Sequence, residues 1–406
     1  MNNSHIVIIG NGVAGVSAAE EARTRDRDAK ITIIGNEGIP YYYRASLTEW
    51  IAEELSDKSL TARTSDFYHS MAIDQIEGTV AQVYPEEKQL LFEDGRSLTY
   101  TTLCIATGGK PNTIHFEGLD ENQIITYRNI ADARLIKSKL SHNPHVLIIG
   151  GGVLGLELAA GLKRIGVKNV AIIEYFRHIA RPIMDEPLAR WLEARIQTDG
   201  FHLFLNDTID HVEGKTAILK SGQVQHFDLL IEAVGITPSF PKVTDLDIGK
   251  GIRVDEFGQT NLPGIFACGD CTETFIHSKG KWQTTRIWLD CARQGRAAGA
   301  SMAGGKHPYV KKAFFNCSDI YLEQYSYIGD PHGEGEIYYY HQGSTHRKVR
   351  LVDDVLAGAV LINNRQGTIP IFESVGMDLS GFGEELAHPD FDWNTISGEN
   401  WDYRFY

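Results

Sequence analysis

The chain has 406 residues, of which 42% are hydrophobic and 23% charged, and its formal net charge is −14. This length exceeds one ordinary core and predicts two or three domains. The negative charge argues against a nucleic-acid partner, because phosphate binding needs a basic surface. The first predicted strand begins at residue 5 and no apolar run could span a bilayer, so we expect a cytoplasmic protein without a secretion signal or membrane contact.

The apolar stretch 5–9 predicts a buried strand and runs into a Gly-x-Gly-x-x-Gly motif followed by a helical segment. Gly10 suits the tight turn, Gly12 lets the backbone approach a pyrophosphate, and Gly15 lets helix and strand pack closely. The pyrophosphate would lie on unpaired N–H groups at the positive end of the helix. The motif predicts a dinucleotide site; a purely structural glycine turn is the alternative.

Residues 30–37 predict a second strand ending in Glu37, whose carboxylate could accept both hydroxyls of a ribose. An aromatic turn, residues 38–43, then leads to Arg44 and a predicted helix. An arginine among tyrosines could bind phosphate or stack on a planar ring. A solvated arginine at a helix start is the other reading.

Alternating residues between 78 and 98, with Asp94 and Gly95 in between, predict an antiparallel hairpin. Residues 102–109 predict another buried strand that ends in small residues. Small side chains at that end would let the backbone come close to a bound cofactor.

The glycine motif occurs a second time, at Gly150, Gly152 and Gly155, after the apolar stretch 145–149. The next predicted strand again closes with an acid, Glu174. One such motif is weak evidence, but two complete ones in a single chain imply two bound dinucleotides. If the second site takes a nicotinamide nucleotide, Glu174 would favour NADH over NADPH, because a carboxylate binds free ribose hydroxyls and repels a phosphate.

The rest of this second unit is less distinctive. Arg177 and Arg181 follow Glu174 closely and could counteract its preference. Hairpins are predicted near Leu203 and Thr216, and residues 228–238 predict a strand and a proline turn that close the unit.

Residues 260–271 predict a short strand that delivers Asp270 to a helix start, where a carboxylate could bind ribityl hydroxyls and benefit from the helix dipole. Residues 288–299 predict a helix whose small-residue face packs on the first glycine helix. Aromatic, strand-like pieces beyond Pro308 predict an α+β domain. The acidic aromatic tail from Gly383 is either a docked cap or a disordered end.

Together these pieces resemble the FAD-dependent pyridine-nucleotide reductases with the glutathione-reductase-like fold. The resemblance covers nearly the whole chain and implies an α/β fold with two Rossmann-like dinucleotide-binding domains, one for FAD and one for NAD, plus a C-terminal α+β domain. The implied domains are FAD-binding (1–113 and 238–309), NAD-binding (114–237) and C-terminal (310–406).

The resemblance also implies the residues that bind each cofactor. For FAD they are Gly10, Gly12, Val13, Ala14, Gly15, Asn36, Glu37, Arg44, Val80, Ala106, Thr107, Gly108, Arg128, Gly269, Asp270 and Trp288. For NADH they are Gly150, Gly152, Val153, Leu154, Gly155, Glu174, Val234 and Gly235. Glu157 is a catalytic candidate that could orient the nicotinamide; an ordinary helix glutamate is the alternative.

Within this family, cysteines separate the branches. Disulfide reductases carry a redox pair near the position of Arg44, and peroxide-reducing or water-forming oxidases carry one cysteine there, but this chain has none between Met1 and Leu103. It resembles instead the ferredoxin and rubredoxin reductases, which pass electrons from NADH through FAD to a small iron–sulfur or rubredoxin-type protein.

Two departures distinguish the chain from the ferredoxin reductases of oxygenase systems. Those enzymes have a lysine where this chain has Glu49, and a tryptophan where it has Asn316. Glu49 is more like NADH:rubredoxin oxidoreductases and is the second catalytic candidate. The expected mechanism uses no protein nucleophile, and a homodimer through the third domain is an option by analogy.

Five cysteines at irregular spacing fit a reducing compartment. Cys268 and Cys271 form a Cys-x-x-Cys at a predicted helix start, which can be a redox pair. The residues between them are the flavin-contacting candidates, so a redox disulfide is the minor reading, a zinc site is less favoured still, and no metal is expected. Cys291 is expected only to pack.

Two other functions stay open. One is an NADH-dependent reductase of a small acceptor such as oxygen or a quinone. The other is a regulated NADH-binding flavoprotein similar to apoptosis-inducing factor.

Overall fold

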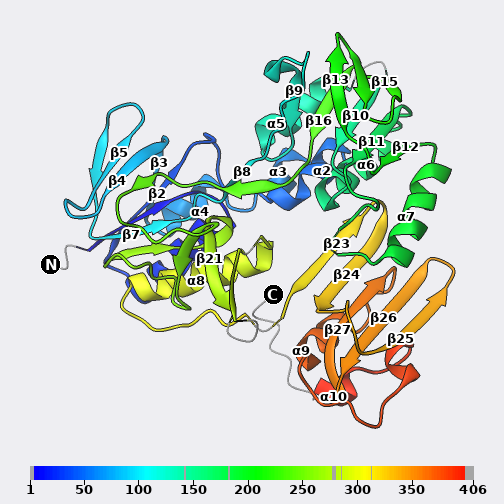
Figure 1. Ribbon diagram of the computed structural model, residues 1–406. Coiled ribbons are helices and arrows are strands. Elements are labelled where there is room, and N and C mark those ends of the chain that lie inside the picture. The colour runs from blue at the N-terminus through cyan, green and yellow to red at the C-terminus, as the bar shows by residue number, and fades with distance from the viewer. Residues whose placement is uncertain are drawn as a thin grey trace. The chain divides into compact units, whose positions relative to one another are not determined.

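A computed structural model describes residues 4–140, 143–181, 183–276, 280–284, 286–311 and 313–397 (Figure 1). The chain divides into two compact units, each built from several segments. Unit 1 comprises Met1–Trp50, Leu55–Pro111 and Ile236–Lys311. Unit 2 comprises Ile51–Glu54, Asn112–Gly235 and Lys312–Tyr406.

The core of unit 1 is a five-stranded parallel sheet with the order β20-β7-β1-β2-β3. Its strands are β1 (His5–Ile9), β2 (Lys30–Gly35), β3 (Ile73–Glu77), β7 (Thr102–Ile105) and β20 (Ile265–Ala267). The central strand β1 is an unbroken apolar run that is almost wholly buried, as expected for a parallel strand covered on both faces. Its carboxyl end delivers the first glycine motif.

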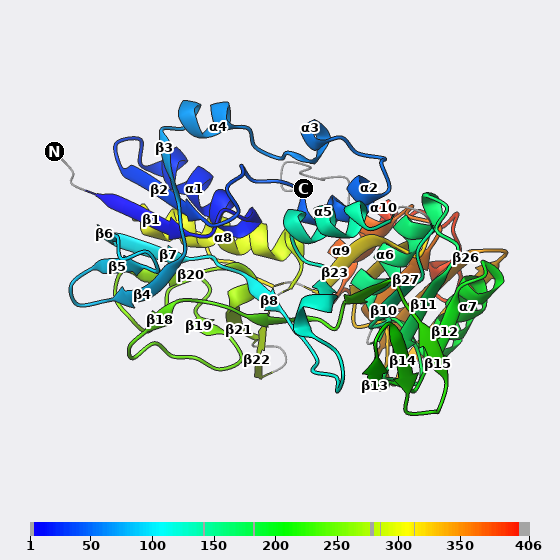
Figure 2. The same cartoon turned by 90° about the horizontal axis from the view of Figure 1, so that it is seen from above.

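Helices α1 (Val13–Arg25) and α8 (Trp288–Met302) pack closely in unit 1 (Figure 2). A Cβ atom on Gly295 would lie 2.2 Å from the Ala14 carbonyl oxygen, and one on Gly299 would lie 2.2 Å from that of Ala18. The predicted small-residue face is confirmed, because only hydrogen atoms fit between these backbones.

Smaller sheets and short helices complete unit 1. A four-stranded sheet has the order β18-β4-β5-β6, a three-stranded one β19-β21-β22, and strands β8 and β17 pair with each other. The strands are β4 (Val80–Tyr84), β5 (Gln89–Phe92), β6 (Ser97–Thr99), β8 (Gly109–Pro111), β17 (Ile236–Pro238), β18 (Lys242–Val243), β19 (Ile252–Val254), β21 (Thr272–Ile276) and β22 (Lys281–Thr284). The helices are η1 (Arg44–Ser46), α2 (Leu47–Ile51), α3 (Asp57–Leu60), α4 (Ser65–Ser70) and η3 (Gly269–Cys271).

Unit 2 contains a second parallel sheet, with the order β12-β11-β10-β16-β9. Its strands are β9 (Ile124–Thr126), β10 (Val146–Ile149), β11 (Val170–Glu174), β12 (His202–Leu205) and β16 (Leu229–Glu232), with helices η2 (Glu121–Gln123), α5 (Ile130–Ser138), α6 (Val153–Arg164) and α7 (Glu186–Thr198). An antiparallel meander lies beside it, formed by β13 (Ile209–Glu213), β14 (Thr216–Leu219) and β15 (Val224–His226).

The C-terminal part of unit 2 is an antiparallel sheet with the order β23-β24-β27-β26-β25. Its elements are β23 (Phe315–Ile320), β24 (Glu323–Gly329), β25 (Glu336–Gln342), β26 (Thr345–Val352), β27 (Val355–Ile362), α9 (Thr368–Ser374), η5 (Glu384–Ala387) and α10 (Asn394–Ser397). Leu386, Ala387 and Trp393 are buried in its core, so this part of the tail is a docked cap. Trp401 and Tyr406 lie outside the described residues.

The α/β class with two Rossmann-like sheets is confirmed, and three local predictions are wrong. Leu203 lies in β12, which pairs in parallel with β11 and is not part of a hairpin. Pro238 ends strand β17, which pairs antiparallel with β8, and does not form a closing turn. Gly269–Cys271 is a single 3₁₀ turn followed by strand β21, not a helix start. The assignment of separate FAD, NAD and C-terminal domains stays a prediction.

Candidate functional site

The first glycine motif lies between β1 and α1. Gly10 has φ +122°, and a Cβ there would lie 2.1 Å from the Ala106 carbonyl oxygen. A Cβ on Gly15 would lie 1.9 Å from the Gly10 carbonyl oxygen. A Cβ on Gly12, in contrast, would have no neighbouring heavy atom within 4 Å in the part of the chain that the structure describes. The outer glycines allow the backbone to close, and the middle one borders open space.

This open space adjoins the N-terminus of α1. Gly12 is the N-cap residue and offers no side chain to the free N–H groups of the first turn, and no acidic side chain lies in that turn. The N-terminal end of a 13-residue helix carries partial positive charge. The geometry fits a dinucleotide pyrophosphate.

Glu37 lies just beyond β2, and its carboxylate is held by two neighbours. It accepts a hydrogen bond from the Tyr42 hydroxyl at 2.7 Å and forms an ion pair with Arg44. Burial lowers the pKa of Arg44, but Tyr42, Glu37 and Asp270 raise it by more, so the guanidinium stays charged. Arg44 begins η1, but its guanidinium is ion-paired with Glu37 and is therefore not a freely solvated group.

Asp270 lies in η3, on a loop fixed by α8. The Gly269 N–H donates to the Gln294 side-chain oxygen at 2.8 Å, and Gln294 is buried. Gly269 has φ +83°, and a Cβ there would lie 2.8 Å from that of Ala14. Because η3 is a single turn, the expected helix dipole does not act on Asp270. The sequence alone did not indicate the positioning role of Gln294, which stands next to Gly295 in the helix predicted at residues 288–299.

Four of the five cysteines are buried, and all five are free thiols. The sulfur atoms of Cys104 and Cys268 are 3.5 Å apart, while Cys271 donates to the carbonyl oxygens of Ile105 and Cys268. Burial raises the pKa of Cys271 to about 12. The Cys104 thiol, followed by burial, raises that of Cys268. Thiols held in their protonated form are poor redox nucleophiles.

Aromatic side chains line the region around Arg44. The Trp288 Nε1–H donates to the Tyr41 hydroxyl at 3.1 Å, and the Tyr43 ring lies 6.5 Å from that of Trp288. Tyr43 and Trp288 are 40% and 43% exposed, so these rings are available to a planar ligand or a partner. Burial raises the pKa of Tyr41 to about 12, which keeps this hydroxyl protonated.

The remaining FAD candidates are placed as follows. Val80 begins β4, Asn36 follows β2, and Thr107 and Gly108 follow β7, all in unit 1. Arg128 follows β9 in unit 2. Their assignment to FAD stays a prediction, as does a catalytic role for Glu49, which is half-buried in α2.

The second glycine motif repeats the first geometry between β10 and α6. Gly150 has φ +108°, and a Cβ there would lie 2.6 Å from the Ala233 carbonyl oxygen. A Cβ on Gly155 would lie 2.1 Å from the Gly150 carbonyl oxygen. Around Gly152, the described residues again leave the position of a Cβ without a neighbour within 4 Å. Val153, Leu154 and Glu157 lie in the first turns of α6, and Val234 and Gly235 follow β16.

Glu174, the last residue of β11, is 8% exposed and ties this loop to the sheet. Its Oε2 accepts from the Gly151 N–H at 2.7 Å and its Oε1 from the Phe176 N–H at 2.8 Å. Arg181 does not pair with it; the guanidinium lies 4.7 Å above the Phe176 ring. The carboxylate is thus already oriented beside the glycine loop.

A second buried acid, Glu232, ends the adjacent strand β16. Its Oε1 accepts from the Ile114 N–H at 3.0 Å, and burial raises its pKa. The sequence contains a signal for it, because Glu232 is the only charged residue in the stretch 229–235. The signal is weak, because acids at strand ends are common.

One group of side chains in unit 2 has metal-ligand composition: His145, His226 and Asp228. All three are exposed, and Lys215 Nζ lies 3.2 Å from Asp228 Oδ1, so this carboxylate already faces a cation. The group lies at the amino-terminal ends of β10 and β16, whereas the glycine motif follows the carboxyl-terminal end of β10.

Over residues 4–295 the chain matches the pyridine nucleotide-disulphide oxidoreductases, and it belongs to that family. It is an oxidoreductase of the class that uses FAD and NADH, and its two parallel sheets, each with a glycine loop that borders open space, fit these two dinucleotides. Among the described residues, no helix is both long and apolar enough to cross a membrane.

Three curated relatives and one solved structure are similar to this chain. The assimilatory nitrate reductase electron transfer subunit of Bacillus subtilis is 27% identical over 408 residues, which is 96% of this chain but 52% of the relative, so the chain spans about half of that protein. The benzene 1,2-dioxygenase system ferredoxin–NAD(+) reductase subunit of Pseudomonas putida is 26% identical over 82% of each chain. Rubredoxin-NAD(+) reductase of Pseudomonas putida is 27% identical over 66% of this chain and 71% of the relative. A ferredoxin reductase structure from Rhodopseudomonas palustris superimposes with a TM-score of 0.88 at 20% identity, covering 98% of this chain and 100% of the other.

Proposed function

We propose that this protein passes electrons from NADH through FAD to a small electron-transfer protein, a rubredoxin or a ferredoxin. The observation that carries the proposal is the region around Arg44, where the side chains are the aromatic Tyr41, Tyr43 and Trp288. No cysteine precedes Cys104 in the chain. The thiol of Cys291 on α8 lies 3.2 Å from Asp270 Oδ1, but burial raises its pKa, so it stays protonated and is a poor relay. Electrons would then leave to an external acceptor.

The protein residues bind and orient in this mechanism. Gly12 and the N-terminus of α1 would hold the FAD pyrophosphate, Arg44 and Asp270 would lie at its flavin part, and Gln294 would position Asp270 through Gly269. Gly152 and the N-terminus of α6 would hold NADH, with Glu174 on its adenosine ribose. FAD supplies the conversion of a two-electron hydride into single electrons.

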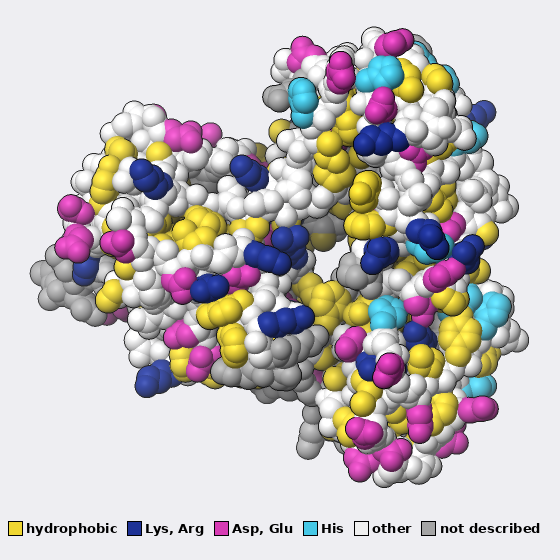
Figure 3. Space-filling view, in the orientation of Figure 1, with side chains coloured by type: hydrophobic (Ala, Val, Ile, Leu, Met, Phe, Trp, Pro, Cys, Tyr) yellow, Lys and Arg dark blue, Asp and Glu magenta, His cyan; other side chains and the backbone are white. Residues whose placement is uncertain are grey.

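The relatives support a protein carrier as the acceptor, since two of them are reductases named for ferredoxin and rubredoxin. Glu49 favours rubredoxin within this proposal. The face in Figure 3 has both basic and acidic side chains. The charge of this face therefore does not distinguish a rubredoxin from a ferredoxin as the partner. We extend the proposal to a cytoplasmic location and, by analogy, to a homodimer.

The test is an anaerobic titration of the purified yellow protein with NADH, followed by mixing with oxidised rubredoxin and, separately, ferredoxin. Rapid flavin bleaching and fast reoxidation by one carrier are expected. Bleaching without reoxidation by either carrier contradicts the proposal and favours a small acceptor such as oxygen or a quinone. If NADH does not bleach the flavin, the proposed electron transfer is contradicted, and a regulated NADH-binding flavoprotein is favoured instead. Light scattering on the same sample measures the oligomeric state.

A further inference from the structure

A tight turn at residues 180–185, of which Pro182 is outside the described residues, lies against the second glycine loop. The Ala180 N–H donates to the Gly151 carbonyl oxygen at 2.8 Å, and the Ile183 and Met184 N–H groups donate to the Ala180 carbonyl oxygen at 2.9 and 3.1 Å. A Cβ on Gly151 would lie 2.9 Å from the Ile179 side chain. The turn and the loop therefore form one packed piece, and a shift of the turn would move the loop.

The backbone of this turn needs support from its surroundings. Ala180 is 1% exposed and has φ +55°, a left-handed conformation that non-glycine residues rarely adopt. Such a conformation persists where neighbouring contacts hold it. On one side, Glu193 of α7 accepts from the Ile179 N–H at 3.2 Å.

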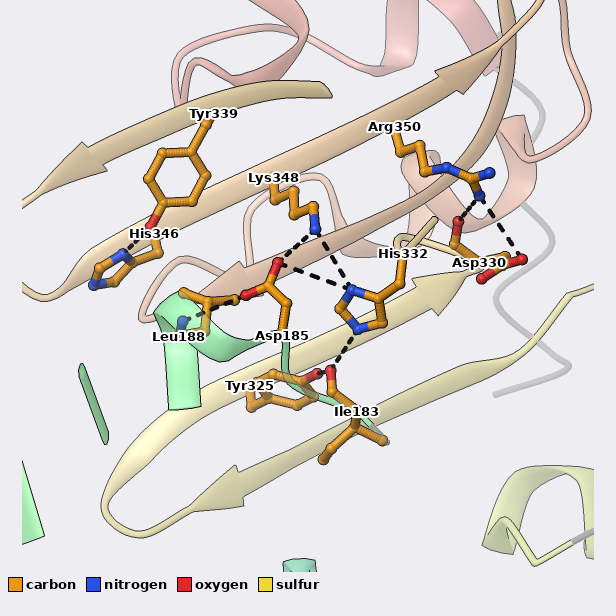
Figure 4. A network of polar contacts seen from close by, with 10 residues as sticks. All are labelled: Ile183, Asp185, Leu188, Tyr325, Asp330, His332, Tyr339, His346, Lys348 and Arg350. Atoms are coloured by element: carbon orange, nitrogen blue, oxygen red, sulfur yellow. Dashed lines mark hydrogen bonds and ion pairs between the residues drawn. The ribbon is translucent and has the colours of Figure 1, made fainter. Parts of the chain in front are cut away.

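Three side chains from the C-terminal part of unit 2 hold the other side of the turn (Figure 4). The Tyr325 hydroxyl and His332 Nε2 both donate to the Ile183 carbonyl oxygen, the latter at 3.1 Å. Lys348 Nζ lies 2.5 Å from Asp185 Oδ2. Lys348 is central to β26 and its side chain is 8% exposed, so its ammonium is fixed by this carboxylate.

Asp185 joins the turn to a helix as well as to the sheet. It is the N-cap residue of α7, and its Oδ1 accepts from the Leu188 N–H at 3.3 Å while its Oδ2 faces Lys348. His332 Nδ1 lies 3.5 Å from Lys348 Nζ and 3.9 Å from Asp185 Oδ2, while its Nε2 faces the Ile183 carbonyl oxygen. One carboxylate thus fixes the position of the turn between two rigid elements.

We propose that Tyr325, His332 and Lys348 are positioning residues for NADH binding, acting through the turn at residues 180–185 on the glycine loop at Gly151. None of the three belongs to the glycine motif or to the sheet that carries it. The inference rests on the proposed use of the second glycine motif for NADH. It assigns to the C-terminal sheet a role in nucleotide affinity.

The test compares Lys348→Met with the matched control Arg347→Met in the FAD-loaded protein. Both residues lie on β26 and are buried, but Arg347 donates to Asn364 and to the carbonyl oxygens of Gln366 and Pro389 and not to the turn or to the segment that carries His332. The measurements are the Kd of NAD⁺, the KM and kcat for NADH with an artificial electron acceptor, FAD content and melting temperature.

We expect Lys348→Met to raise Kd and KM about threefold to tenfold while kcat and FAD content stay at wild-type values. Arg347→Met should leave Kd and KM unchanged even if it lowers the melting temperature. An unchanged Kd in Lys348→Met, or an equal rise in Arg347→Met, overturns the inference. If Lys348→Met does not fold, Tyr325→Phe removes a single hydroxyl from the turn, and a Kd equal to that of the wild type then overturns it. A wild-type protein that binds NADH but reduces no carrier contradicts the proposed function alone and leaves this comparison valid.

Discussion

At the residue scale, the glycines of each motif divide into two kinds. Gly10 and Gly150 have positive φ and abut a neighbouring carbonyl group, so a side chain there would prevent the chain from closing. Gly12 and Gly152 have ordinary extended backbone and border open space. The first kind is required for folding and the second for the approach of a ligand.

The first prediction follows from this division. Gly12→Ala should fold normally but bind FAD about tenfold or more weakly, because its methyl group occupies the ligand space. Gly152→Ala should retain FAD and raise the KM for NADH by a similar factor. FAD content and NADH kinetics measure the two effects, and Gly10→Ala, which should not fold, is the control for a structural glycine. Normal FAD affinity in Gly12→Ala would show that the pyrophosphate does not bind there.

The second prediction concerns the choice between NADH and NADPH, which we assign to Glu174. The wild type should use NADH in preference to NADPH, and Glu174→Gln should narrow the ratio of their kcat/KM values by about tenfold. The amide has the same size as the carboxylate and does not repel a 2′-phosphate. Its NH2 group cannot accept from the Gly151 or Phe176 N–H, so the melting temperature is measured as well. If the wild type uses NADPH as well as NADH, the role given to Glu174 is wrong.

His346 provides a prediction for pH. Burial lowers its pKa to about 4, and its neutral ring faces the Tyr339 hydroxyl, with the Nδ1–oxygen distance at 2.5 Å. The unfolded chain protonates near its ordinary pKa of about 6.5, so the free energy of unfolding should fall as the pH decreases from about 6.5 to about 4 and level off below. Urea unfolding between pH 4 and 8 should show a weaker decline for His346→Phe. The exposed His307→Phe should keep the wild-type profile; equal profiles for both variants would refute the assignment.

At the scale of elements, α1 and α8 are held by backbone contact and not by large side chains. Gln294 of α8 accepts a hydrogen bond from Gly269 of η3, and α1 follows directly on the first glycine motif. The contact between α8 and α1 therefore links η3 to that motif. The packing of two helices therefore determines where Asp270 lies relative to Gly12.

Gly299→Ala tests that contact. The added methyl group would lie 2.2 Å from the Ala18 carbonyl oxygen, and the free energy of unfolding should fall by about 1–3 kcal/mol because the helices must separate. Urea unfolding measures the change. Gly383→Ala, whose Cβ would have no described neighbour within 4 Å, should be close to neutral. A neutral Gly299→Ala would mean that the two helices are not in backbone contact.

At the scale of the whole molecule, the two glycine motifs belong to different units, each with its own parallel sheet. Each unit interrupts the other in the sequence, so neither is a continuous segment. A ligand that binds one unit should stabilise that unit first.

Hydrogen exchange provides the final prediction. FAD should protect the backbone around Gly12, Thr107 and Asp270 in unit 1, whereas NAD⁺ added to the FAD-loaded protein should protect Gly152 and Glu174 in unit 2. Protection by NAD⁺ confined to unit 1 would reverse the assignment of the two motifs.

The sequence alone predicted the two dinucleotide motifs, the parallel strands that carry them and the small-residue face of the helix at residues 288–299. These features are local, because a glycine motif between an apolar strand and a helix is encoded within about thirty residues. The same local reasoning failed at Leu203 and at Gly269–Cys271. An apolar strand pairs in parallel or in a hairpin according to its neighbours in space, and the chain after Asp270 continues as a strand because β19 and β22 pair with it.

Only the tertiary structure decided which distant side chains meet. Gln294 fixes Gly269, Cys104 lies beside Cys268, and Lys348 reaches Asp185 across 163 residues of sequence. Burial, which no spacing encodes, raises the pKa values of the Cys-x-x-Cys thiols and makes the Lys348 ion pair a structural link. The two dinucleotide sites could be predicted from the sequence, because each glycine motif is a run of contiguous residues. The positioning of the loops that hold them depends on contacts that form only when the chain is folded.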